Sequence, residues 1–265
     1  MVNENKNNEW AIILGASSGF GLATAKKLAV HGYNLCLIYR ARRSDMASIE
    51  SNLEAIKNEN DIQLTHHNVD AIKQENRVRV LEDLKEKNND GSGVKVLVHS
   101  IAKGNLKPMQ SSEGATLQND DFRLTIESMA ISLYDWTKDI FARNLFSDDA
   151  RIISFTSEGN TKAWPNYAAV SAAKVALEAI TRNIALEYAP HGIKANCIQA
   201  GVTDTASFKM IPGSDAIREH TLKRNPNKRL TTPKDVANVV YLLTRDEAKW
   251  ITGTIIPVDG GEHLS

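Results

Sequence analysis

The sequence has no excess of either charge, since its 32 Lys and Arg residues equal its 32 Asp and Glu residues. This balance removes the electrostatic argument for a nucleic-acid partner or an anionic membrane surface. No stretch approaches the ~20 consecutive apolar residues of a membrane span. The polar segment MVNENKNNEW also lacks the apolar core of a signal peptide. We therefore expect a cytoplasmic protein without a membrane span or a nucleic-acid partner.

Cysteine is also scarce, with only Cys36 and Cys197. Both lie in apolar runs, NLCLIY and ANCIQA, which favour strands, so we expect two buried thiols and a reducing compartment rather than a disulfide. The seven histidines are scattered along the chain. Because His66 and His67 are neighbours, they would point to opposite faces of a strand, and no metal site is predicted.

Short apolar runs rich in Val, Ile and Leu alternate along the chain with longer amphipathic segments. Strands that are apolar along nearly their whole length are typical of a parallel sheet covered on both faces. The sequence therefore predicts one α/β domain over 1–265, a Rossmann-like, doubly wound parallel sheet of about seven strands with helices on both faces. The expected strands cover 10–14, 33–39, 62–66, 94–99, 151–156, 193–199 and 254–258, and the expected helices cover 19–31, 45–59, 72–88, 120–147, 165–189 and 233–245.

A glycine-rich turn follows the first expected strand, in ILGASSGFGLATAKKLAVHG. Gly15, Gly19 and Gly21 would permit a tight turn, the close approach of a pyrophosphate to the backbone, and packing of the next helix on the strand. The N-terminus of that helix would then stabilise the phosphate charge. The turn indicates a dinucleotide site, and a glycine-rich turn that binds no ligand is the alternative.

The spacing Gly-x3-Gly-x-Gly resembles that of the short-chain dehydrogenase/reductase family, and the similarity extends along nearly the whole chain. VLVHSIAKG and RIISFTSEG resemble the family's fourth and fifth strands, IKANCIQAGVTDT its sixth strand and cofactor loop, and ITGTIIPVDGG its C-terminal signature. The resemblance implies a nicotinamide dinucleotide, with Asn68, or Asp70 if the loop shifts, beside the adenine. The cofactor-binding residues that it implies are Gly15, Ser17, Ser18, Gly19, Phe20, Gly21, Asn68, Val69, Ser100, Ile101, Ala102, Lys174, Gly201, Thr203 and Thr205.

The second expected strand ends in LIYRARRSDM, where dehydrogenases that prefer NAD usually place an acidic residue to bind the ribose hydroxyls. Here Arg40, Arg42 and Arg43 stand instead, with Asp45 two residues beyond. Guanidinium groups suit a 2′-phosphate because they form charge-assisted bidentate hydrogen bonds. The cluster favours NADPH, and a solvated basic turn is the alternative.

In this family a tyrosine meets the reacting oxygen, and a lysine holds the nicotinamide ribose and lowers the tyrosine pKa. The resemblance of SAAKVALEAITRNIALE identifies Lys174 as that lysine, with Val170 four residues earlier and Tyr167 seven earlier. On an α-helix seven residues turn through about 700° and rise ~10.5 Å, so Tyr167 and Lys174 would share a face, one turn further apart than usual. Ser157 aligns with the family's catalytic serine, although a strand-end hydroxyl bonded to nearby backbone explains it equally well.

The longer spacing has a chemical reason. In ketone reduction the carbon that takes the hydride carries the oxygen to be stabilised, whereas in an α,β-unsaturated thioester that oxygen lies two carbons further along. Tyr167 would then stabilise the enolate oxygen, as an oxyanion hole does. The same Tyr-x6-Lys pattern marks the bacterial enoyl-acyl-carrier-protein reductases, which HSIA, ISLYDW and QAGVTDT also resemble. Many of these enzymes carry a second tyrosine where this chain has Ser157, and the NADPH-dependent type III enoyl reductases, which lack it, are the most similar branch.

This resemblance implies NADPH-dependent reduction of the C2–C3 double bond of trans-2-enoyl thioesters, carried by acyl carrier protein or CoA, in fatty acid synthesis. Hydride would go to the β-carbon, with Tyr167 at the enolate oxygen and Lys174 at the nicotinamide ribose. One alternative is a 3-oxoacyl-acyl-carrier-protein reductase or other short-chain dehydrogenase/reductase, against which Val170 argues. Another is a sensor that binds the cofactor without turnover, against which the presence of both Tyr167 and Lys174 argues.

The segment 203–230 mixes Pro, Gly and charge with apolar residues, which predicts a substrate lid with short helical pieces. The basic stretch LKRNPNKR within it would receive an acidic carrier protein, or would form a solvated surface. The apolar residues expected to line an acyl channel, or simply to pack the lid, are Phe208, Met210, Ile211 and Pro212.

Tyr134 and Lys138 have the family's usual four-residue spacing, but they precede the fifth expected strand, whereas the catalytic pair should follow it. A core or interface role is therefore expected for this pair. The family usually forms tetramers through its two long helices, here about 120–147 and 165–189, and the resemblance implies a homotetramer.

Overall fold

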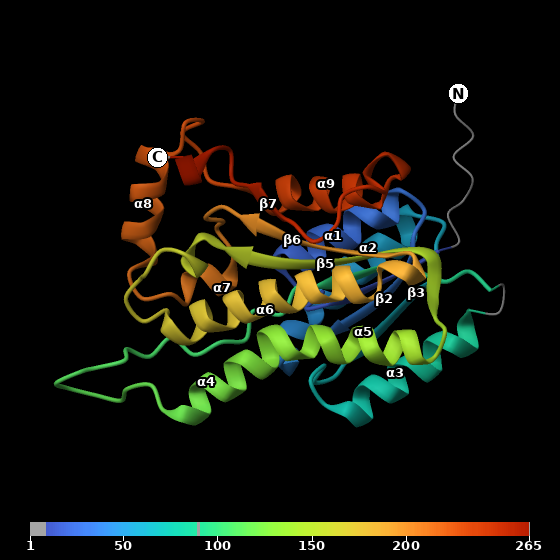
Figure 1. The fold of residues 1–265 in the computed structure, drawn as a ribbon, viewed down its shortest axis with the longest axis horizontal. Coiled ribbons are helices and arrows are strands. Elements are labelled where there is room, and N and C mark those ends of the chain that lie inside the picture. The colour runs from blue at the N-terminus through green and yellow to red at the C-terminus, as the bar shows by residue number, and fades with distance from the viewer. Residues whose placement is uncertain (1–8, 89–90, 265) are drawn as a thin grey trace.

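Seven parallel strands form a sheet in the computed structural model, which describes residues 9–88 and 91–264. The expectation about a signal peptide concerns mainly residues 1–8, which lie outside the described residues. The strands are β1 (Trp10–Leu14), β2 (Asn34–Tyr39), β3 (Leu64–Asn68), β4 (Val94–His99), β5 (Phe146–Ser157), β6 (Ile193–Ala200) and β7 (Ile255–Val258). Their order in the sheet is β3-β2-β1-β4-β5-β6-β7 (Figure 1), which confirms the predicted fold class.

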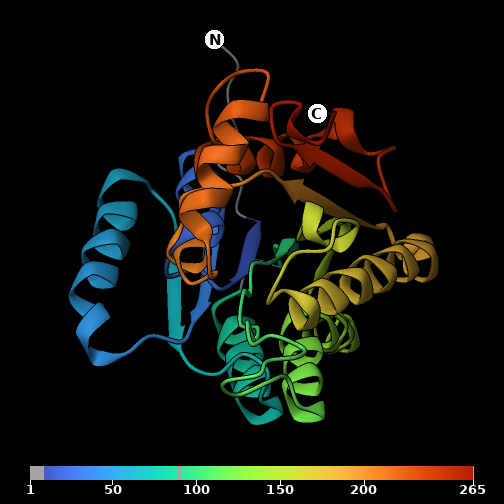
Figure 2. The same cartoon turned by 90° about the vertical axis from the view of Figure 1, so that its left-hand side faces the viewer.

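Helices cover both faces of this sheet (Figure 1, Figure 2). Since successive residues of a strand point to opposite faces, Ile12 packs with α3, α5 and α6, whereas Ile13 packs with α1, α2 and α9. The helices are α1 (Gly19–Val30), α2 (Met46–Glu59), α3 (Gln74–Lys87), α4 (Asn119–Ile126), α5 (Ser132–Ala142), α6 (Ala168–Glu187), α7 (Ala206–Lys209), α8 (Ser214–Arg224) and α9 (Pro233–Thr244). The sheet is thus buried between two helical layers, as its apolar strands predict.

Some predicted boundaries are wrong. The expected helix 120–147 consists of α4 and α5 joined by a π-helical turn, Glu127–Ile131, and it ends before Asn144. Asn144 has a φ of 53°, in the left-handed region that ends helices. β5 then begins at Phe146, earlier than predicted, and β3 lies two residues later than the predicted 62–66 because it pairs with β2 in that register.

The strand order reverses between β1 and β4, because β2 and β3 lie on one side of β1 and the later strands lie on the other. Open parallel sheets bind ligands outside the carboxyl ends of the strands at such a point. The segment 203–230 contains α7 and α8 and lies beyond the carboxyl ends of β5 and β6 (Figure 1). The fold therefore places this segment and the glycine turn at the same edge of the sheet.

Cys36 and Cys197 are buried as free thiols, as predicted. Within the part of the chain that the structure describes, no helix combines the length and the apolar character needed to cross a membrane.

Candidate active site

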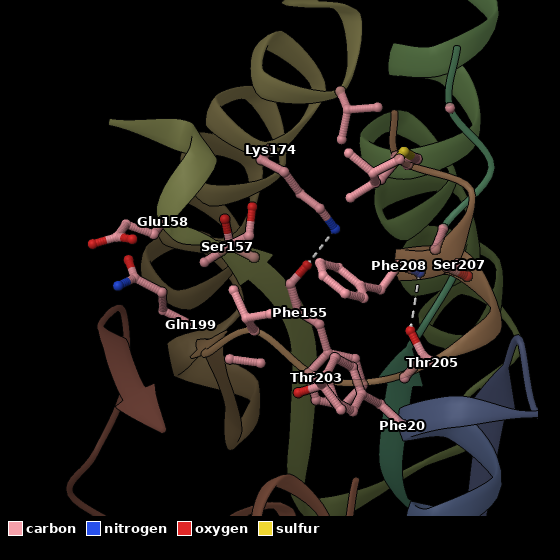
Figure 3. Close-up of a pocket in the computed structure, with 18 of the residues that line it drawn as sticks. Phe20, Phe155, Ser157, Glu158, Lys174, Gln199, Thr203, Thr205, Ser207 and Phe208 are labelled. Carbon is pink, nitrogen blue, oxygen red and sulfur yellow. Dashed lines mark hydrogen bonds between the residues drawn. The ribbon is translucent and has the colours of Figure 1, made fainter. Parts of the chain in front are cut away.

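Two adjoining pockets open at the carboxyl edge of the sheet, and together they form a cleft. The outer pocket lies between the glycine turn and the end of β2, and the inner pocket lies between the end of β5, the start of α6 and the segment 203–230. The residues that line both pockets are Phe20, Ser100, Ile101, Ala102, Thr205 and Ser207. Figure 3 shows residues of the inner pocket pointing toward one another from these elements.

The cleft brings together most of the site residues predicted from the sequence. Those that line it are Gly15, Ser17, Ser18, Gly19, Phe20, Arg40, Arg42, Val69, Ser100, Ile101, Ala102, Ser157, Tyr167, Lys174, Gly201, Thr203, Thr205, Phe208, Met210 and Ile211. Gly21, Arg43, Asn68 and Pro212 do not line it.

Two of the three glycines of the turn, Gly15 and Gly21, leave no room for a side chain. Gly15 has a φ of +83°, and a Cβ there would lie 2.3 Å from the Ser100 carbonyl oxygen. A Cβ at Gly21 would lie 2.2 Å from the Gly15 carbonyl oxygen, so Gly21 serves the packing of the turn and not the lining of the cleft. α1 begins at Gly19, and its N-terminus meets the outer pocket. This cradle fits the pyrophosphate of a dinucleotide.

The end of β2 carries positive charge into the outer pocket. Arg40 and Arg42 line it, whereas Arg43 begins a 3-10 turn outside it. Arg40 Nη1 lies 2.6 Å from Asp70 Oδ2, and Lys103 Nζ lies 3.8 Å from the same oxygen. Lys103 was not predicted as a site residue, since it follows β4 and only the fold brings it to this end.

Asn68 does not face the cleft, contrary to the first of the two expectations for the adenine site. Its side chain binds the backbone of Ala41, accepting from the Ala41 N–H at 3.0 Å and donating to the Ala41 carbonyl at 3.2 Å. Val69 and Asp70 line the outer pocket instead. Asp70 and not Asn68 therefore lines the pocket, and its place beside the adenine stays a prediction.

Tyr167 lies just before α6 and not on it, which corrects the helical geometry assumed for its spacing from Lys174. Its backbone (φ −110°, ψ 1°) is not helical, and Asn166 before it is left-handed with a φ of 63°. The phenol is nevertheless buried in the inner pocket, and its oxygen lies 3.2 Å from Ser157 Oγ. Burial raises the pKa of Tyr167, and the hydrogen bond with Ser157 opposes that rise.

Gly159 fixes the position of the Tyr167 ring. A Cβ at Gly159 would lie 2.5 Å from Tyr167 Cε1, so the ring packs directly on the glycine backbone. The ring centroid of Trp164 lies 5.4 Å from that of Tyr167. The sequence pattern predicts neither Gly159 nor Trp164 as part of the site, because their contacts with Tyr167 join a strand end to a loop.

Lys174 is also buried, and its Nζ donates a 2.6 Å hydrogen bond to the Phe155 carbonyl (Figure 3). Burial lowers the pKa of Lys174 to about 8. Four residues earlier, Val170 packs with Met129 and Tyr167 in an apolar cluster. The position from which a phenol would meet a ketone in this family is therefore apolar here.

His99 was not predicted as a site residue, yet it lines the inner pocket at the end of β4. Its Nε2 lies 2.7 Å from Ser132 Oγ. Burial, together with the charge of Lys174, lowers the pKa of His99 to about 3, so its ring is neutral. A neutral ring hydrogen-bonded in the protein supports the site without acting as an acid.

The loop after β6 closes the cleft. A Cβ at Gly201 would lie 2.5 Å from Thr231 Oγ1, and Thr203 Oγ1 donates to the Gly201 carbonyl at 2.9 Å. Thr205 Oγ1 accepts from the Phe208 N–H at 3.2 Å and caps α7 (Figure 3). The same residues that line the cleft thus hold α7 over it.

Tyr134 and Lys138 lie on α5 outside both pockets. Lys138 Nζ lies 6.0 Å from the centroid of the Tyr134 ring, which is 42% exposed. The two residues therefore lie near each other on the surface of α5 and do not belong to the cleft.

Comparisons with known proteins identify the family to which this chain is similar. The family model described as "Enoyl-(Acyl carrier protein) reductase" matches residues 15–263. The enoyl-acyl-carrier-protein reductase (NADH) FabI of Aquifex aeolicus is 30% identical over 190 residues, 69% of this chain and 68% of that protein. Its crystal structure matches with a TM-score of 0.82 and 25% identity, over 98% of both chains.

Two further relatives differ in the cofactor or the reaction that their names state. The NADPH-dependent FabI of Staphylococcus aureus is 28% identical over 98% of both chains. The 3-oxoacyl-acyl-carrier-protein reductase FabG of Staphylococcus epidermidis is 28% identical over 97% of this chain and 100% of that protein. Since the family model spans nearly the whole chain, this protein belongs to the short-chain dehydrogenase/reductase family of nicotinamide-dependent oxidoreductases, in its enoyl-acyl-carrier-protein reductase branch.

Proposed function

We propose that this protein reduces the C2–C3 double bond of trans-2-enoyl thioesters with NADPH, as a step of fatty acid synthesis. The observation that carries the proposal is the arrangement of the inner pocket. Tyr167 and Ser157 present two hydroxyls 3.2 Å apart, while Val170 makes the position one turn before Lys174 apolar. With no phenol at the position that would meet a ketone, this donor pair suits an oxygen that lies two carbons from the carbon taking hydride.

The bound nicotinamide would supply the hydride, and the residues of this chain would place the substrate for it. As the β-carbon gains hydride, the electron pair of the double bond moves toward the thioester oxygen, and the α-carbon of the resulting enolate would then take a proton from water to give the saturated thioester. The Tyr167 phenol, supported by Ser157, would donate a hydrogen bond to that oxygen as it becomes negative. Lys174 would hold the ribose, and its charge would also favour the enolate.

Arg42, Arg40 and Lys103 support NADPH as the cofactor. All three line the outer pocket, where a 2′-phosphate would meet guanidinium and ammonium groups. Arg40 forms an ion pair with Asp70, and Lys103 lies close to the same carboxylate. In this proposal Arg42 is therefore the arginine that binds the 2′-phosphate. The relatives include enzymes named for NADH and for NADPH, so cofactor preference is a matter for measurement.

The apolar residues of the inner pocket support an acyl chain as the substrate. Met129, Tyr167, Val170 and Ala173 form a buried cluster. The partly buried residues packed against that cluster are Leu106, Ile126, Trp164 and Ile211. Phe208 and Ile211 line the pocket from α7 and the turn after it, which fits the proposed lid over 203–230.

Residues 222–229 offer fewer cations for docking an acidic carrier protein than the sequence implies. Arg224 is held by Glu158 and Glu262, and Arg229 Nη1 lies 2.7 Å from Asp235 Oδ2. Lys223 and Lys228 are then the cations through which this stretch would meet a carrier.

A homotetramer in the cytoplasm completes the proposal. Leu124, Ile131, Tyr134 and Val175 are large apolar residues exposed on α4, the π-helical turn, α5 and α6, the helices expected to form the interface. Light scattering of the purified protein checks the assembly.

The decisive assay mixes the protein with NADPH and either a trans-2-enoyl or a 3-oxoacyl thioester, and follows the loss of nicotinamide absorbance. We expect oxidation with the enoyl substrate. Oxidation with only the 3-oxoacyl substrate would instead assign a ketone reductase, and cofactor binding with no turnover would assign a sensor.

A further inference from the structure

A buried carboxylate that the proposed reaction does not use lies behind Lys174. Glu178 is four residues further along α6 on the same buried face, and it is only 7% exposed. Its Oε1 accepts a 2.5 Å hydrogen bond from Thr156 Oγ1 and another from Asn160 Nδ2. Because the Asn160 amide nitrogen can only donate, this oxygen is an acceptor of two hydrogen bonds.

Three successive residues of β5 each hold one group of the site. The Phe155 carbonyl accepts from Lys174 Nζ at 2.6 Å, and the Thr156 hydroxyl donates to Glu178. Ser157 Oγ lies 3.2 Å from the phenol that we propose to be catalytic. One strand end therefore fixes the lysine, the carboxylate and the phenol relative to one another.

The titratable groups that face Lys174 from the strands and from the start of α6 are uncharged at neutral pH. Burial raises the pKa of the Cys197 thiol on β6 to about 11, so this group stays neutral while Lys174 titrates. His99 on β4 is neutral because burial holds its pKa at about 3. Burial also raises the pKa of Tyr167, which keeps that phenol protonated.

On α6 itself, Glu178 supplies negative charge to Lys174. Its charge opposes the effect of burial on the lysine, and the two residues lie one helical turn apart. Arg182, one turn beyond Glu178, is exposed and lies further from the lysine. Among the described groups named above, Glu178 is thus the carboxylate whose charge favours a buried ammonium, and the Cys197 thiol on β6 also opposes the effect of burial on the pKa of Lys174.

We propose that Glu178 is a positioning residue that keeps Lys174 protonated inside the closed site, so that its ammonium remains available to the nicotinamide ribose. The role of Lys174 in turnover rests on the proposed function, but the coupling of the two charges does not. Without the carboxylate, burial favours the neutral amine, which loses the charge that would hold the ribose and stabilise the enolate.

The test is the substitution Glu178→Gln, which keeps the size of the side chain and an acceptor oxygen for Thr156 and Asn160 but removes the charge. We expect the alkaline limb of the pH profile of kcat/KM to shift to lower pH by about one unit or more. A pKa shift of this size is expected when an opposite charge one helical turn away is removed. Activity on the acid side of the profile should be kept. Glu187→Gln, an exposed residue of the same helix, is the matched control and should leave the profile in place.

A second measurement follows Lys174 itself. In protein labelled with ¹³C-lysine, the NMR signal of Lys174 is assigned by its loss in Lys174→Met. The pKa at which this signal titrates should fall by the same amount in Glu178→Gln. An unmoved titration in a folded Glu178→Gln variant overturns the inference. If the native protein reduces no enoyl thioester, the proposed function fails, while this titration still decides the role of Glu178.

A double variant tests the inference if Glu178→Gln does not fold. If Glu178→Gln fails to fold because the lysine charge is left uncompensated, the double variant Lys174→Met/Glu178→Gln should fold, since it buries neither charge. Failure of both variants to fold would show that the fold needs Glu178 whatever the charge of Lys174, and would overturn the inference.

Discussion

The phenol oxygen of Tyr167 lies 3.2 Å from the hydroxyl oxygen of Ser157. Ser157 stands at the position where many related enoyl reductases carry a second tyrosine, and the contact gives it a partner other than the backbone. Because burial raises the pKa of Tyr167, the phenol remains protonated at neutral pH and can donate to an oxygen that becomes negative. The two hydroxyls therefore form one hydrogen-bonded pair in the wall of the inner pocket.

Removing the phenol hydroxyl should abolish most turnover. We expect Tyr167→Phe to lower kcat with an enoyl thioester by about 10²-fold or more, the order seen when an oxyanion donor is deleted. Ser157→Ala should cost less, because the phenol remains. Steady-state kinetics measure both losses, and NADPH binding by fluorescence should be unchanged in either variant. A Tyr167→Phe variant with full turnover would exclude the assigned role.

Gly159→Ala should displace the Tyr167 ring. The added Cβ would lie 2.5 Å from Tyr167 Cε1, a distance that forces the ring to move. A catalytic donor shifted by about 1 Å can cost as much as ~10²-fold in rate, so we expect kcat to fall by at least about tenfold. The dissociation constant of NADPH should not change, because Gly159 does not line the outer pocket. Unchanged kcat would show that the ring is not held by this glycine.

The burial of Lys174 predicts a pH-dependent contribution to stability. Its pKa is about 8 in the folded protein against an ordinary value of 10.5, so between these values the unfolded chain binds more protons and stability rises with pH. Relative to Lys174→Met, the native protein should gain about 3 kcal/mol of unfolding free energy across this window. Urea denaturation of both proteins from pH 7 to 10.5 measures the difference. Parallel curves would contradict the low pKa.

Arg42 and Arg43 offer a matched test of cofactor choice, because Arg42 lines the outer pocket and Arg43 does not. We expect Arg42→Ala to lower the preference for NADPH over NADH by about tenfold, the loss of a charge-assisted contact with the 2′-phosphate. Arg43→Ala should leave the preference unchanged. The ratio of kcat/KM for the two cofactors is the measurement, and equal effects of the two substitutions would assign the cluster to a solvated turn.

Several features of the site follow from local pattern alone. Apolar strands that alternate with amphipathic helices predict the doubly wound sheet, because that is the arrangement that covers both faces. The glycine spacing predicts a cradle, and the structure brings Gly15 against Ser100, where no side chain fits. Tyr167 and Lys174 follow β5 in the sequence. Since the sheet is parallel, they are expected at its carboxyl edge.

Other features could not be predicted, because they depend on contacts between distant segments. Asn68 and Asp70 are both plausible partners for an adenine until Ala41 binds the amide of Asn68 and turns it away. A helix that includes Tyr167 is equally plausible until Asn166 adopts a left-handed backbone before it.

The sequence by itself determined the fold class, through the alternation of apolar strands with amphipathic helices, and the family, through the resemblance of its ordered motifs. Only the tertiary structure decided which groups meet. Ser157 joins Tyr167, and Thr156 holds Glu178 one turn behind Lys174, because the end of β5 lies against α6. Burial then shifts the pKa of Tyr167 up and that of Lys174 down, and burial is a property of the packed chain and not of any segment of it.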